Sequence, residues 1–89
     1  MSAARCPTEI LLVNAPAALA AAREALAAGE GRLDLSPLVR LDSAAVAVLI
    51  ALRREAGARA SFLNPPANLR ALAQLYGVDA LLFDSVSSS

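Results

Sequence analysis

The sequence predicts an α/β fold in a single domain, and three observations support this. Short aliphatic runs alternate three times with helix-forming segments, which is typical of a parallel or mixed β-sheet with helices packed on it. The chain has 89 residues, the size of one small domain with a modest core. Hydrophobic residues make up 57% of the chain and aromatic residues only 3%. Much of the hydrophobic fraction is alanine, so closely packed helices with small side chains on their faces are expected.

The first strand and helix are predicted on either side of a proline. Residues 8–13 form an aliphatic run bounded by Pro7 and Pro16, which predicts a strand buried on both faces. An alanine-rich helix is expected over residues 17–28, opened by Pro16 and ended by a glycine. The residues before this strand offer no pattern of their own, so residues 1–7 are expected to be flexible.

The second strand and helix contain the most informative motif. Residues 32–36 alternate apolar and polar side chains and predict a strand that Pro37 ends. Asp42 and Ser43 then stand directly before a long apolar run, which predicts a second helix ending near Gly57.

The third strand and helix follow in the same order. Residues 59–63 predict a strand, and Asn64 is expected to cap a third helix whose first position is Pro65. A short final element is expected over residues 78–83. Apolar residues at positions i, i+3, i+4 and i+7 predict that the third helix buries one stripe, which consists of Leu69, Leu72, Ala73 and Tyr76.

Composition excludes several classes of function. The formal net charge is zero, so nucleic acid and anionic membrane surfaces are not expected as partners. The chain has no histidine and one cysteine, so we expect no catalytic residues, no metal site and no cofactor. No apolar run is long enough for a membrane span, and a cytoplasmic location is expected. The domain is expected over residues 8–84, with a disordered tail at 85–89.

Asp42 and Ser43 permit two interpretations. Either residue is simply an N-cap, or the pair lies at a site for a phosphate or a partner protein, because a helix N-terminus favours negative charge. The helix that follows is apolar all round for more than two turns before Arg53, so the face opposite its core face is either covered by a partner or packed against a neighbouring helix. With Ser43, the residues of this candidate partner-binding face are Ala44, Ala47, Val48 and Ala51, opposite a core face of Val46, Leu49 and Ile50.

The order of these motifs resembles the STAS domain family, and within it the MlaB branch. The resemblance rests on residues 33–36, on Asp42 and Ser43 with their apolar helix, and on residues 64–69 and 75–78. It implies a STAS-like single α/β domain, a small mixed or parallel sheet with about four helices packed mainly on one face. It also implies a non-enzymatic subunit that binds the ATPase of an Mla-type phospholipid ABC transporter, peripheral to the inner membrane through that complex. Ser43 then occupies the position of the family's hydroxyl residue.

Two alternatives remain open beside this resemblance. An anti-sigma factor antagonist would be phosphorylated on Ser43 by its partner kinase. Ala45 stands where family members commonly carry glycine, and Asn14 stands where the sigma-regulator branch often has an acidic residue; both departures weigh against this switch. A small enzyme built on Asp34, Asp42 and Ser43 would lack a histidine, a lysine and a phosphate-binding loop.

Overall fold

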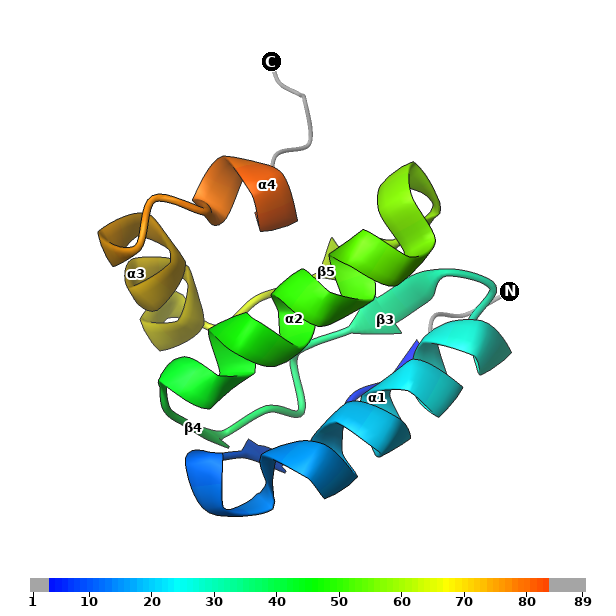
Figure 1. The fold of residues 1–89 in the computed structure, drawn as a ribbon, viewed down its shortest axis with the longest axis horizontal. Helices are drawn as coiled ribbons and strands as arrows, with labels where there is room; N and C mark the ends of the chain where they lie inside the picture. The colour runs from blue at the N-terminus through cyan, green and yellow to red at the C-terminus, as the bar shows by residue number, and fades with distance from the viewer. Residues whose placement is uncertain (1–3, 84–89) are drawn as a thin grey trace.

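The computed structural model describes residues 4–83 of the chain, so the tail expected at 85–89 lies outside the described residues. Helices and parallel strands alternate along this part, and the predicted α/β class is confirmed (Figure 1). The α-helices are α1 (Ala15–Ala28), α2 (Ser43–Ala56), α3 (Ala67–Leu75) and α4 (Asp79–Phe83), and the short 3₁₀ helices are η1 (Leu12–Asn14) and η2 (Gly57–Arg59). The strands are β1 (Ala4–Arg5), β2 (Glu9–Ile10), β3 (Arg32–Asp34), β4 (Arg40–Leu41) and β5 (Ser61–Leu63).

The strands form one sheet in the order β1-β3-β5 and a separate pair β2-β4, and every described pairing is parallel. Leu33 of β3 lies opposite Ala4 on one side and Phe62 on the other. In the small pair, Ile10 lies opposite Leu41. Parallel strands require long crossover connections, which α1, α2 and the segments around them provide.

The helices cover mainly one face of the sheet, as expected for this class. In Figure 1, α1 and α2 lie in front of the strands. Leu33 and Phe62 are buried on this side, whereas their neighbours Arg32 and Ser61 are exposed on the other. This alternation follows from the two-residue period of a strand with one buried face.

The core is mainly aliphatic, and both the helices and the strands contribute side chains to it. Helix α1 contributes Ala18, Ala22 and Leu26, which recur every four residues along one face. Alanine at these positions lets α1 approach the sheet and α2 closely. The largest fully buried side chains are Ile10, Leu33, Leu35, Leu38, Leu49, Leu52, Leu69 and Leu82.

Residues 4–6, which belong to the stretch 1–7 expected to be flexible, contact the sheet instead. Ala4 and Arg5 form β1 and pair with β3, and the backbone N–H of Cys6 donates to the Asp34 carbonyl at 3.0 Å. The Cys6 side chain is buried. So short a strand has no periodicity, and β3 stabilises it through backbone hydrogen bonds that the sequence does not reveal.

The first predicted strand is also shorter than expected. Only Glu9 and Ile10 of residues 8–13 are in a strand, and the chain then turns into η1. The Asn14 side chain causes the change, because it accepts from the Leu11 backbone N–H at 2.7 Å and donates to the Glu9 carbonyl at 3.3 Å. The prediction of a strand buried on both faces is therefore wrong for the second half of this run.

Helix α3 begins later than its expected cap. Pro66 occupies the N-cap position, whereas Asn64 lies in the preceding turn with a left-handed φ of 57°. Its side-chain amide donates to Asp34 Oδ1 at 3.2 Å instead of capping the helix. The expected cap role of Asn64 is thus corrected: two successive prolines delay the helix start. Of the predicted stripe, Leu69 and Ala73 are buried, but Tyr76 is 52% exposed at the C-cap.

Arg53 joins the C-terminal end of α2 to β5 and α4. Its guanidinium donates to the carbonyls of Gly57 and Ala60, each at 2.7 Å, and lies 5.0 Å from the centre of the Phe62 ring. It also donates to the carbonyls of Leu81 and Leu82 in α4, at 3.0 and 3.2 Å.

None of the helices within residues 4–83 is both long enough and apolar enough to span a bilayer.

Candidate functional site

The candidate site lies where β4 ends and α2 begins. Asp42 is the N-cap of α2, and its Oδ1 accepts a hydrogen bond from the Ala44 backbone N–H at 2.8 Å. Its other oxygen, Oδ2, accepts a hydrogen bond from the backbone N–H of Leu12 at 3.1 Å. Leu12 lies 30 positions earlier in the chain. One carboxylate therefore caps the helix and ties η1 to it.

The outward stripe of α2 is narrower than the predicted face. Ser43 and Ala47 are exposed and Ala51 is partly exposed, so these three predicted residues do face outward. Ala44 and Val48 are only 7% and 4% exposed, so they do not lie on the outward face on which they were predicted. We use the name α2 stripe for Ser43, Ala47 and Ala51.

The burial of Ala44 and Val48 results from helix packing. On a helix they share a side with Glu55, and the Glu55 carboxylate accepts two hydrogen bonds from the Arg23 guanidinium of α1, at 2.9 and 2.7 Å. That side of α2 therefore faces α1. Packing against a neighbouring helix, the alternative left open by the sequence, applies to these two residues.

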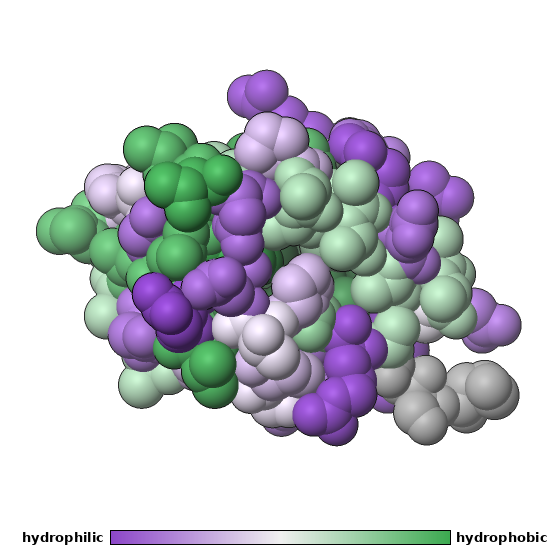
Figure 2. Space-filling model, turned by 90° about the horizontal axis from the view of Figure 1, so that it is seen from below, coloured by the Kyte–Doolittle hydropathy of each residue, from purple (hydrophilic) through white to green (hydrophobic). Residues whose placement is uncertain are grey.

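An exposed aliphatic turn next to the α2 stripe is the feature that the sequence prediction missed. Leu12 and Val13 in η1 are 76% and 89% exposed, and Val39 before β4 is 70% exposed. Figure 2 shows strongly hydrophobic residues gathered at the end of the molecule where η1 lies, on the left in Figures 1 and 2. The available signal was Asn14 followed closely by Pro16, which is typical of a helix entry rather than of a continuing strand.

The two carboxylates that suggested an enzyme, those of Asp34 and Asp42, have different hydrogen-bond partners. Asp34 Oδ1 accepts from the Ser36 backbone N–H at 3.0 Å and from the Asn64 amide, and these bonds lower the pKa of Asp34. The hydrogen bonds of Asp42 go to η1 and to α2 instead. Among residues 4–83, no three Asp, Glu or Cys side chains are grouped to bind a metal ion.

Cys6 is also unsuited to act as a nucleophile. Its side chain is buried next to β3, and burial, together with the nearby Asp34 carboxylate, raises the pKa of the thiol to about 11. A thiol with so high a pKa is almost entirely protonated at neutral pH, whereas the thiolate is the reactive form.

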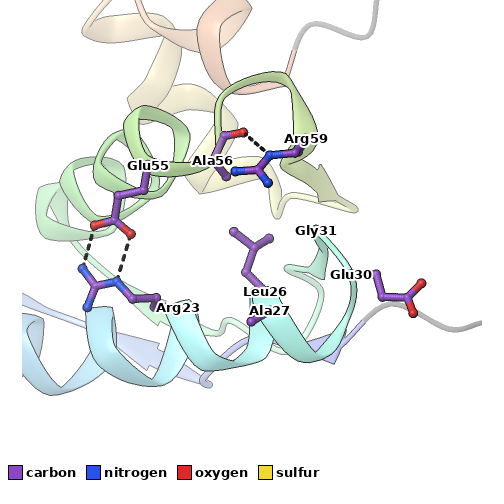
Figure 3. Close-up of a pocket in the computed structure, with 8 residues that line it drawn as sticks. All are labelled: Arg23, Leu26, Ala27, Glu30, Gly31, Glu55, Ala56 and Arg59. Carbon is purple, nitrogen blue, oxygen red and sulfur yellow. Dashed lines mark hydrogen bonds and ion pairs between the residues drawn. The ribbon is translucent and has the colours of Figure 1, made fainter.

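A groove on the surface lies between the C-terminal ends of α1 and α2. It is an open groove of about 360 Å³, and Leu26 points into it between the two helices (Figure 3). The Arg23–Glu55 ion pair closes one side, where hydrogen bonds from Arg23 lower the pKa of Glu55. Arg59 on the other side donates to the Ala56 carbonyl at 3.3 Å. This groove contains none of the residues predicted to bind a partner.

One known protein family matches most of the chain. A family model described as "MlaB, STAS domain" matches residues 8–83, which is most of the chain. No curated protein and no solved structure matches it significantly. The parallel strands, the helices on one face and the Asp42–Ser43 helix entry agree with the resemblance found in the sequence. The chain therefore belongs to the MlaB-type STAS domain family.

Proposed function

We propose that this protein is a non-enzymatic accessory subunit that binds the ATPase of an Mla-type phospholipid ABC transporter. In this role it supports assembly or activity of the transporter, and it is cytoplasmic, held at the inner membrane through the complex. Membership of the MlaB-type STAS family is the observation that carries the proposal.

The α2 stripe is the surface proposed to contact the ATPase. Its small side chains allow a partner to approach the helix backbone closely, because neither alanine nor serine projects far from it. Since α2 packs against α1, α3 and α4, the stripe is held in one orientation and loses little conformational entropy when it binds.

The test is the substitution of Ala47 by arginine. Ala47→Arg places a long, charged side chain in the middle of the stripe, and Ser43→Asp adds a carboxylate at its start. Each is expected to weaken binding to the co-expressed Mla-type ATPase by roughly tenfold or more, as a disrupted central contact does. Ala20→Arg, the same change on the exposed face of α1, should leave binding unchanged. Affinity is measured by calorimetry, and circular dichroism checks that each variant is folded. Equal binding by wild type and Ala47→Arg would show that α2 is not the contact.

The exposed Ser43 favours a second function. The first residue of α2 presents its hydroxyl to solvent, so a kinase could reach it, as in an anti-sigma factor antagonist. A phosphate there would bring a charge of about −1.5 to −2 next to Asp42. Incubation with the anti-sigma factor kinase of the same organism, followed by mass spectrometry, tests this function. An unmodified Ser43 would exclude it.

A further inference from the structure

We infer that η1 is a second contact element for the ATPase, next to the α2 stripe, and that Asp42 is the positioning residue that holds it there. The inference rests on the proposed function and names the part of the partner involved: an apolar recess on the ATPase surface that receives Leu12 and Val13. Three observations on the described residues lead to it.

The first observation is that the exposed aliphatic side chains belong to a fixed turn. Leu12 and Val13 are the most exposed large hydrophobic residues among the described ones. The turn that carries them is closed by the Asn14 N–H bond to the Leu11 carbonyl at 3.0 Å and by the Asn14 side chain, which binds the backbone on both sides of Ile10. A turn fixed in this way cannot withdraw its aliphatic side chains from water, and a contiguous exposed apolar patch is typical of a contact surface.

The second observation is that the turn and the α2 stripe share one support. Asp42 Oδ2 accepts from Leu12, the residue presented, while Oδ1 accepts from Ala44, one residue after the start of the stripe. One side chain therefore links η1 to the N-terminus of α2, in addition to the pairing of β2 with β4 that precedes both segments. A partner that contacts Ser43 lies next to this turn.

The third observation concerns the chemistry of the occupant. Neither Leu12 nor Val13 carries a charge, and the α2 stripe is likewise uncharged. The matching surface on the ATPase is then an apolar recess for the turn beside a flat contact for the helix, and the apolar area removed from water supplies most of the affinity.

Asp42→Asn separates positioning from helix capping. Asparagine is as good an N-cap as aspartate, so its side-chain oxygen can still accept from Ala44, but its amide nitrogen cannot accept from Leu12. We expect faster amide hydrogen exchange at Leu12, unchanged exchange in the body of α2, and an affinity for the ATPase several-fold lower. If the variant binds as wild type does although Leu12 exchanges faster, Asp42 does not position the docking surface.

Val13→Ser tests the contact itself. Its matched control is Leu81→Ser, which removes an exposed aliphatic side chain from α4, at the top of the molecule in Figure 1, whereas η1 lies at the bottom. Val13→Ser should weaken ATPase binding by roughly tenfold and Leu81→Ser should not, because only a desolvated anchor contributes this much. Thermal unfolding of both variants should match that of the wild type, since both side chains are exposed.

The outcomes separate the two proposals. Loss of binding in Ala47→Arg with wild-type affinity in Val13→Ser refutes the role of η1 and leaves the proposed function intact. No binding of the wild-type chain to the ATPase refutes both. A dimer of the isolated chain that Val13→Ser converts to a monomer would make a second copy the occupant, and it too overturns the inference.

Discussion

Replacing Arg53 by alanine should destabilise this domain more than any other change of a charged residue in its described part. The Arg53 side chain lies between the C-terminal end of α2, the start of β5 and the last turn of α4. Four backbone carbonyls accept from its guanidinium, and the Phe62 ring lies beneath it. Arg53→Ala removes this donor from all four carbonyls, of which that of Gly57 still accepts from the Ala60 N–H, and it removes the group that holds α4 against β5.

The magnitude follows from the burial of these contacts. A hydrogen bond to a charged group is worth about 1.5–3 kcal/mol when deleted singly, and the cation–π contact adds about 0.5–1 kcal/mol. The four bonds share one side chain, and the bond to Leu81 is solvent-exposed, so water replaces part of the loss. We therefore expect a loss of about 2–4 kcal/mol in the free energy of unfolding. In a domain of this size that lowers the melting temperature by about 10–25 °C.

Urea unfolding followed by circular dichroism measures this loss. Arg54→Ala is the matched control, because Arg54 is the next residue of α2, carries the same charge and is exposed. Its effect should stay within about 0.5 kcal/mol. Arg53→Lys should fall between the two, since an ammonium keeps the charge but cannot reproduce the fork of the guanidinium. Equal unfolding midpoints for Arg53→Ala and Arg54→Ala would refute the reasoning.

Three further predictions concern stability. Leu49→Ala, at a fully buried position of α2, should lower the free energy of unfolding by about 2–5 kcal/mol in denaturant unfolding. Ala47→Arg on the same helix should lower it little, and similar losses would mean that the burial pattern is misassigned. Burial raises the pKa of Cys6 from 9.0 to about 11, so the unfolding free energy should be flat below pH 9 and fall as the pH rises toward 11; Cys6→Ala, melted over the same range, should lack this decline. Glu30→Gly should stabilise the chain by about 1 kcal/mol in thermal melts, because Glu30 has a left-handed φ of 56°; an unchanged or lower melting temperature contradicts this.

The sequence predicted most elements of the fold because their signals are local. The apolar run after Asp42 forms α2, and Gly57, with φ 60°, lies where the helix was expected to end. The alternation in residues 32–36 marks β3. Caps, glycines and side-chain periodicity act within a few residues of the backbone they control, so they can be recognised without knowledge of the rest of the chain.

The candidate site was only partly predictable for the same reason. Asp42 has the cap role that its place before the helix suggests. Its second bond, to Leu12, joins positions far apart in the sequence, and no local pattern indicates it. Leu12 and Val13 have the composition of a buried strand, and only the hydrogen bonds of Asn14 turn them outward.

The sequence by itself determined the α/β class, the family and the place of Asp42 and Ser43 at the start of a helix. Only the tertiary structure decided which side of α2 remains outside. In the turns before Arg53, α2 is apolar all round and has no polar face to orient it, so the packing of α1 against Ala44 and Val48 decides which residues are left for a partner. The same packing left Ser43 and Ala47 exposed, next to an aliphatic turn that Asp42 holds in place.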